Sequence, residues 1–199
     1  VRGLGAPETA SPAECEVAVG GIDWARYSDY TAVIAVRVRD GACDVVGIDR
    51  FSGMSWSAQI ERVREFLVRH RVCAVLTDQT SIGDPLLEQL RRALSESAID
   101  IRVEGLVFTN QSKRELVEDL SLRFAHDTVT IPRDERLMRE LQFFEYEVTD
   151  SGNVRLAARR GYHDDLVVAL ALACRQARSV DSSGGYLTAG GRVSADAWW

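Results

Sequence analysis

The chain has 199 residues, of which 46% are hydrophobic and 27% are charged, and its formal net charge is −6. These values are typical of one globular domain whose core needs neither disulfides nor a structural metal. No apolar run approaches the roughly 20 residues of a membrane helix, and residues 1–16 lack the basic and apolar segments of a signal peptide. The negative charge disfavours a dedicated high-affinity DNA-binding protein, because such binding depends on clustered Lys and Arg.

The cysteines and the composition of the chain ends indicate the redox state and the bounds of the domain. Four cysteines stand far apart without a CxxC pair, which disfavours a zinc site, and we expect Cys73 and Cys174 to be reduced and buried. Residues 1–15 and 180–199 are rich in small and polar residues, which predicts a flexible leader and a flexible tail. The folded domain is therefore expected over residues 16–179.

The first part of the domain predicts three antiparallel strands. Residues 17–22, 31–38 and 43–51 are rich in β-forming residues, and turn residues separate them. Asp40-Gly41 is a typical tight hairpin turn between the second and third segments. We therefore expect a three-stranded meander.

After residue 57, helical and strand patterns alternate. Apolar residues at helical spacing predict helices near residues 60–67, 86–90, 116–124 and 163–178, while apolar runs predict strands at 72–77 and 101–108. Residues 142–160 predict a hairpin whose turn is at Asp150-Ser151-Gly152-Asn153. The whole pattern predicts an α/β protein of the RNase H-like fold. Its mixed five-stranded sheet would join the three-stranded antiparallel meander to two parallel strands, flanked by helices, with an added β-hairpin.

Acidic residues stand at the ends of several predicted elements. Asp23 ends the first strand and Asp78 ends the fourth, and parallel neighbours would bring both carboxylates to one edge of the sheet. Asp164 and Asp165 open the last helix, which can carry a third acid to the same place. Converging carboxylates repel one another unless a cation lies between them, and oxygen ligands suit Mg²⁺ or Mn²⁺. Two such ions are the usual apparatus of phosphodiester hydrolysis.

Each acid also has a purely structural interpretation. An Asp after a strand favours a turn, and an Asp at the start of a helix is a common cap. One of Asp164 and Asp165 is expected to be the N-cap or first-turn residue of the last helix in any case. The functional prediction depends on the joint placement of these residues.

Four motifs, in this order and spacing, resemble the nuclease domain of viral (tailed bacteriophage) terminase large subunits, in the RNase H-like or RuvC-like superfamily. The resemblance covers residues 17 to about 178. Each motif is short, and the order of all four makes the match specific. They are GIDWA at 21–25 with SDYTAV at 28–33, DQTSIG at 78–83, NQSK at 110–113, and HDD at 163–165 leading into ALALA at 169–173.

The resemblance implies a set of metal ligands. It implies that Asp23 bridges two ions and that Asp78 and Asp165 or Asp164 complete the cage, with Asp165 ranked first. Asp29 is either a water-mediated ligand or a turn residue. Many relatives carry a further acid where this chain has Val168, so one ligand of the last helix is missing here.

Several basic residues are candidates for DNA contact. Lys113, the only lysine in the chain, could touch a phosphate, balance the acidic cluster or be a solvated lysine at a helix start. His163 could orient the phosphate, support a metal ligand through a hydrogen bond, or cap the helix. Arg155, Arg159 and Arg160 on the expected hairpin could contact the DNA backbone or form a solvated loop. Interleaved charges near residues 133–140 predict surface ion pairs, at positions Arg133, Asp134, Glu135, Arg136, Arg139 and Glu140.

The resemblance implies a two-metal DNA endonuclease that cuts concatemeric viral DNA during packaging with little sequence specificity. Its implied partners are double-stranded DNA, an N-terminal ATPase domain that this chain lacks, a small terminase subunit and a portal protein, all in the host cell cytoplasm and not at a membrane. Two alternatives stay open. One is another RNase H-like nuclease, such as a Holliday-junction resolvase or a transposase core, and the other is a non-catalytic docking module.

Overall fold

The computed structural model describes residues 17–25, 29–80, 82–96, 100–148, 154–158 and 163–182. The expected leader, most of the expected tail and the expected hairpin turn at 150–153 lie outside these residues. The strands are β1 (Val17–Asp23), β2 (Thr31–Arg39), β3 (Ala42–Phe51), β4 (Val72–Asp78), β5 (Arg102–Leu106), β6 (Val129–Thr130), β7 (Phe144–Val148) and β8 (Val154–Ala158). The helices are α1 (Trp56–Arg69), α2 (Gly83–Ser95), α3 (Asn110–Ala125), α4 (Glu135–Phe143) and α5 (Asp165–Ser182).

The main sheet has the strand order β5-β4-β1-β2-β3-β6. Strands β1, β2 and β3 form the expected antiparallel meander, and β4 and β5 extend it as parallel strands on the other side of β1. A sixth strand, β6, adds two residues beside β3. The expected hairpin forms a separate two-stranded sheet of β7 and β8. This is the mixed α/β arrangement that the RNase H-like prediction requires.

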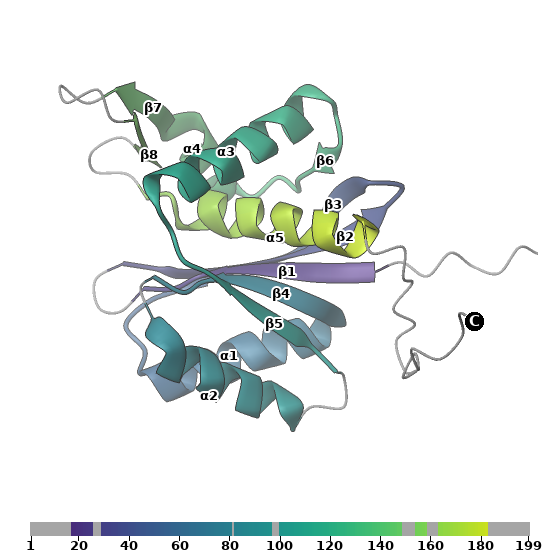
Figure 1. Cartoon of the computed structure of the whole chain (residues 1–199), viewed down its shortest axis with the longest axis vertical. Helices are drawn as coiled ribbons and strands as arrows, with labels where there is room; N and C mark the ends of the chain where they lie inside the picture. The colour runs from purple at the N-terminus through teal and green to yellow at the C-terminus, as the bar shows by residue number, and fades with distance from the viewer. Residues whose placement is uncertain are drawn as a thin grey trace, which may run out of the picture.

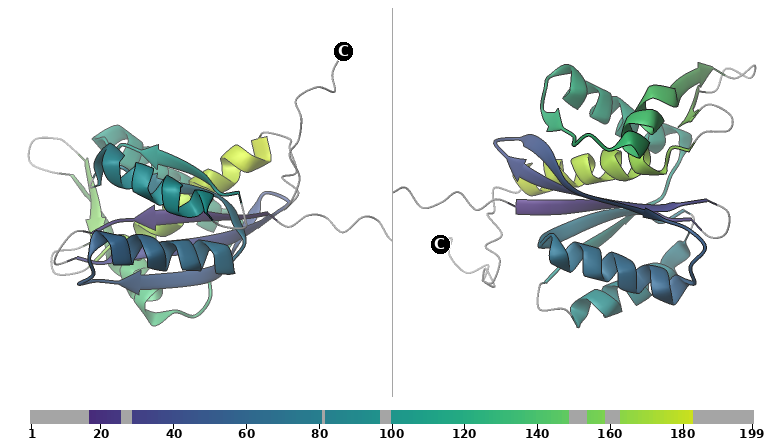
Figure 2. Two further views of the ribbon diagram at one scale, coloured as in Figure 1. Left: turned by 90° about the horizontal axis from the view of Figure 1, so that it is seen from below. Right: turned by 180° about the vertical axis from the view of Figure 1, so that it is seen from behind.

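The sheet lies between two helical layers (Figure 1). Helices α1 and α2 cover one face, and α5 lies on the other face, with α3 and α4 packed over it; the view from behind shows the same layers (Figure 2). Because side chains alternate along a strand, each face has its own apolar core. Val19 of β1 belongs to the core under α5, whereas Ile22 belongs to the core under α1 and α2.

Helix α5 lies very close to the centre of the sheet because Gly21 has no side chain. A Cβ at Gly21 would lie 2.1 Å from the carbonyl oxygen of Ala169 and 2.4 Å from the amide nitrogen of Ala173. The short side chains of Ala169 and Ala173 allow the same approach from the helix. Helix α5 ends at Ser182, beyond the predicted end near 178, and Val180 is still buried in the core.

None of the helices in the described part of the chain is long and apolar enough to cross a membrane. Cys174 is buried and Cys73 is partly buried, and both are free thiols, as the sequence predicts for reduced cysteines.

Candidate metal centre

Two acids end neighbouring parallel strands. The pairing of Ile22 with Thr77 places Asp23 and Asp78 side by side where β1 and β4 end. Strand alternation directs both toward the α5 face, since Val19 and Gly21 of β1 and Ala74 and Leu76 of β4 also face it. The Asp78 side chain is buried, and its Oδ1 accepts a hydrogen bond of 2.8 Å from the Thr80 amide. That bond begins the turn into α2 and fixes the carboxylate at the edge of the sheet.

The start of α5 adds two more acids. Asp165 is its first residue and is only 5% exposed. The Asp164 carbonyl accepts the first helical hydrogen bond, from the Val168 amide, so Asp164 is the backbone cap position. The Asp164 carboxylate lies 3.6 Å from the Lys113 ammonium, in the first turn of α3. Carboxylates from β1, β4 and α5 therefore approach one another.

Their mutual repulsion is visible at Asp23. Burial raises the pKa of Asp23 well above its ordinary value. The negative charges of Asp165, Asp78 and Asp164 raise that pKa further. Lys113 lowers it, but less than the other influences raise it. A cation at the centre would remove this cost, because it would favour the ionised form of every carboxylate.

The pKa of Asp165 is raised as well. Burial raises its pKa to about 8, with further contributions from Asp29 and Glu140, and the guanidinium of Arg50 opposes this rise. Asp165 Oδ2 is buried and has no hydrogen-bond partner. Two nitrogen atoms lie near it without bonding to it: Arg50 Nη2 at 3.7 Å and His163 Nδ1 at 3.8 Å. This oxygen is therefore desolvated and still able to bind a ligand.

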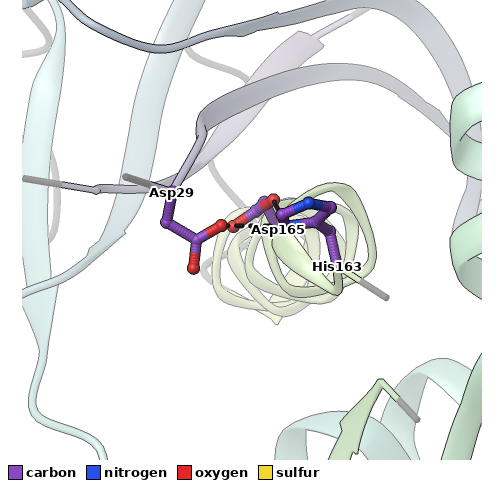
Figure 3. Close-up of side chains that lie close together, drawn as sticks. All are labelled: Asp29, His163 and Asp165. Atoms are coloured by element: carbon purple, nitrogen blue, oxygen red, sulfur yellow. Dashed lines mark hydrogen bonds and ion pairs between the residues drawn. The ribbon is translucent and has the colours of Figure 1, made fainter. Parts of the chain in front are cut away.

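Asp29 and His163 lie beside Asp165, and Figure 3 shows the three side chains meeting at the start of α5. Their possible ligand atoms lie within 4.8 Å of one another, and His163 Nδ1 is 2.9 Å from Asp29 Oδ1. Asp29 Oδ1 also accepts a 3.1 Å hydrogen bond from the Tyr30 amide. Asp29 therefore lies near the acids, and both its ligand and its turn interpretation stay predictions.

Glu140 was not identified from the sequence as part of the site. Its side chain is only 3% exposed, so its interpretation as a surface ion-pairing residue is wrong. Its Oε2 accepts hydrogen bonds from the Leu166 and Val167 amides at 2.7 and 3.3 Å, and its Oε1 accepts one from Arg50 Nη1 at 2.8 Å. The side chain that accepts from these amides therefore comes from α4, whereas Asp164 holds the backbone cap position and Asp165 is in the first turn, as the sequence predicts for this pair. The surface interpretation does hold for Arg136 and Asp134, which pair at 2.7 Å.

The family model of the terminase RNaseH-like domain matches residues 20–176, which include all four carboxylates. The chain belongs to the terminase RNaseH-like domain family. The large terminase subunit of Thermus virus P23-45 is 28% identical over 162 residues, which are 81% of this chain and 32% of that protein. The chain thus spans about a third of the length of this relative.

Solved structures of terminase nucleases share the fold of this RNase H-like domain. The crystal structure of the large terminase nuclease from thermophilic phage G20c matches with a TM-score of 0.70 at 27% identity. The structure of that nuclease with bound magnesium matches with a TM-score of 0.71 at 26% identity. Each comparison covers 81% of this chain and 82% of the other.

The structure describes only some of the basic residues that were predicted to contact DNA. Lys113 is partly exposed and lies beside Asp164, a position that agrees with the charge-balancing alternative. His163 is exposed beside Asp29 and Asp165. Arg155 lies on β8, and Arg159 and Arg160 fall outside the described residues. DNA contact by any of them stays a prediction.

The pKa of Asp165 predicts how the metal-free terminase domain responds to pH. Between the ordinary value of 3.8 and about 8, the folded state holds a proton that the unfolded state has released. The free energy of unfolding should therefore fall as pH rises, by up to about 1.4 kcal/mol per pH unit while Asp165 titrates. Urea unfolding in EDTA between pH 5.5 and 8.5 measures this slope. Asp165→Asn should make the slope shallower, with the raised pKa of Asp23 accounting for part of what is left, and equal slopes in the two proteins would contradict the assignment.

Proposed function

We propose that this chain is a metal-dependent DNA endonuclease domain that holds two divalent ions, Mg²⁺ or Mn²⁺. The observation that carries the proposal is the convergence of Asp23, Asp78, Asp165 and Asp164 from β1, β4 and α5. A structural role would not require several acids to share one desolvated place, since each could cap or turn the chain elsewhere. The bound magnesium in the related G20c nuclease supports the same proposal.

The donor set fits such ions. Hard divalent cations prefer carboxylate oxygens, and Asp165 Oδ2 is a buried oxygen without a hydrogen-bond partner. In this proposal Asp23 would help to hold both ions, since the carboxylates of Asp165, Asp78 and Asp164 all lie close enough to influence its charge. Asp78 would serve one ion, and Asp165 or Asp164 the other. When bound, the ions would supply an activated water and neutralise charge on the phosphate.

The chain's own residues would orient the substrate. Asp78 is held by the Thr80 amide, and Asp29 and His163 occupy the rim beside Asp165, where His163 could meet a phosphate. Lys113 would limit repulsion near Asp164 or touch the DNA backbone, as Arg155, Arg159 and Arg160 would from the hairpin region. No base-reading motif is evident in the sequence, so cleavage should depend little on sequence.

Within a packaging machine, the substrate would be concatemeric viral DNA in the host cell cytoplasm. The matched large terminase subunit is about three times as long as the aligned region, which leaves room for the proposed N-terminal ATPase domain elsewhere in such a protein. The small terminase subunit and the portal would determine where and when the domain cuts. The net charge of −6 agrees with weak intrinsic DNA affinity and delivery by these partners.

Plasmid cleavage tests this proposal directly. The chain is incubated with supercoiled plasmid and Mg²⁺, Mn²⁺ or EDTA, beside Asp78→Asn. We expect nicking and linearisation with either metal, none in EDTA, and a loss of roughly 10³-fold or more in the variant. The variant's circular dichroism spectrum should match that of the wild type, because the substitution keeps the shape of the side chain.

The alternatives give different results. A strong preference for branched over plasmid DNA would favour a junction resolvase. A folded wild-type chain that neither cuts DNA nor binds Mn²⁺ in an electron paramagnetic resonance titration would overturn the nuclease proposal and favour a docking module.

A further inference from the structure

The helix that presents Asp165 is capped by a residue from another element. The amides of Leu166 and Val167 belong to the first turn of α5, where a helix offers them no acceptor of its own, and both donate to Glu140 Oε2. Helix α4 packs against α5, so Glu140 reaches these donors from a separate layer. An Asp at the start of a helix ordinarily folds back onto such amides. Because Glu140 occupies them, the Asp164 and Asp165 carboxylates can face the metal centre.

Arg50 joins this cap to the acid. Its Nη1 donates to Glu140 Oε1 at 2.8 Å, and its Nη2 lies 3.7 Å from Asp165 Oδ2. The strand pairing of Asp23 with Ala32 and of Ala32 with Arg50 puts Arg50 in the same row of the sheet as Asp23. The guanidinium also lies over the Tyr30 ring, with Cζ 3.8 Å from its centroid. Arg50 is thus fixed between two buried acids.

Arg50 and Asp165 hold most of the buried polar side-chain atoms that lack a hydrogen-bond partner in the described part of the chain. Among the described residues, three buried side-chain nitrogen or oxygen atoms lack a hydrogen-bond partner, and two of them are Arg50 Nε and Asp165 Oδ2. Buried polar atoms without partners are costly and rare. An arrangement selected only for stability would pair Arg50 fully with Asp165, whereas this one leaves Oδ2 available.

We propose that Glu140 and Arg50 are positioning residues that fix the start of α5 and direct Asp165 Oδ2 toward the divalent ion. This inference rests on the proposed function and adds two residues to it. Glu140 holds the helix backbone, and Arg50 offsets the charge of Glu140 while its Nη2, 3.7 Å from Asp165 Oδ2, limits how that carboxylate can turn. Neither residue touches the substrate.

Mn²⁺ affinity without DNA tests the two roles at constant charge. Glu140→Ala and Glu140→Gln both remove the carboxylate charge, but only the glutamine keeps an oxygen for the Leu166 and Val167 amides. Glu140→Ala should bind Mn²⁺ about tenfold more weakly than Glu140→Gln. Arg50→Lys keeps its charge but loses the two-nitrogen fork, and it should bind about tenfold more weakly than the wild type.

The chain offers a matched control on the opposite face of the sheet. Arg62 forms a bidentate pair with Asp49 and lies over the Phe51 ring, so it makes the same kinds of contact as Arg50 away from the acids. Arg62→Lys should leave Mn²⁺ affinity unchanged. Electron paramagnetic resonance titration gives the affinity, and near-ultraviolet circular dichroism gives the folded fraction of each protein.

The outcomes separate the two proposals. The positioning role alone would be overturned by one combination of results. In it, the wild type binds Mn²⁺, the two Glu140 variants bind it equally well, and Arg50→Lys binds it as tightly as the wild type. Lower melting temperatures with unchanged affinities would show a purely structural role and overturn it as well. If Glu140→Ala does not fold, the Mn²⁺ affinities of Arg50→Lys and Arg62→Lys decide whether the positioning role holds. A wild-type domain that binds no Mn²⁺ would overturn both proposals.

Discussion

Asp23→Asn should reduce metal-dependent DNA cleavage by about 10³-fold or more, equivalent to about 4 kcal/mol of transition-state stabilisation. Asp23 is coupled to Asp165, Asp78 and Asp164, so its loss removes the carboxylate that both ions would share. The amide has the same shape but no charge. Plasmid nicking rates in Mn²⁺ measure the change.

The same substitution should stabilise the metal-free protein. Burial and neighbouring acids raise the pKa of Asp23, so its ionised form costs folding free energy at neutral pH. We expect a gain of about 0.5–2 kcal/mol in urea unfolding at pH 7.5 in EDTA. Asp44→Asn, on β3, is the control and should change neither property. Unimpaired cleavage by Asp23→Asn would exclude Asp23 from the cage.

The largest expected effect on stability is that of Gly21→Ala. The new Cβ would lie 2.1 Å from the Ala169 carbonyl oxygen and 2.4 Å from the Ala173 nitrogen, and backbone atoms cannot rotate away as side chains do. Helix α5 would have to move off β1, at a cost of about 3 kcal/mol or more. Urea unfolding measures the loss, and a soluble but weakened protein should also bind Mn²⁺ poorly, because α5 carries Asp165.

The adjacent glycine provides the comparison for Gly21→Ala. A Cβ at Gly20 would point to the opposite face, where it would lie 3.2 Å from Leu67 Cδ2 and 3.3 Å from Val75 Cγ2. These are the ends of side chains that can shift by a few tenths of an ångström. Gly20→Ala should therefore cost much less than Gly21→Ala, and equal losses would contradict the close approach of α5 to β1.

The parts of the fold and site that follow from local pattern could be predicted from the sequence. Asp23 and Asp78 each end an apolar strand, and the strand order follows from a meander joined to parallel units, so their meeting at one edge could be expected. The acids at 164 and 165 could be placed at the start of a helix for the same reason. Strand β6 has only two residues, which is too short to give a recognisable pattern.

The support of the site could not be predicted in the same way. Glu140 meets α5 through tertiary packing, and in the sequence it is one charge among several near α4. One signal was available: Glu140 lies three residues after Leu137, which is fully buried, so it is a charge on the apolar face of its helix. Asp164 and Asp165 do stand at the cap position and in the first turn, but local pattern alone cannot reveal a side-chain acceptor from another element.

Helix α5 is covered by other elements on almost every face. It lies between the sheet and the layer formed by α3 and α4, and nearly all its described side chains from Asp165 to Ala177 are buried, with Arg175 the exception. A segment so enclosed opens only when the whole domain unfolds. Under the proposed function, Asp165 would therefore be in place whenever the domain is folded, and loosening of this helix would not time the cut. Under the proposed function, the decision to cut belongs to whatever brings the DNA within reach.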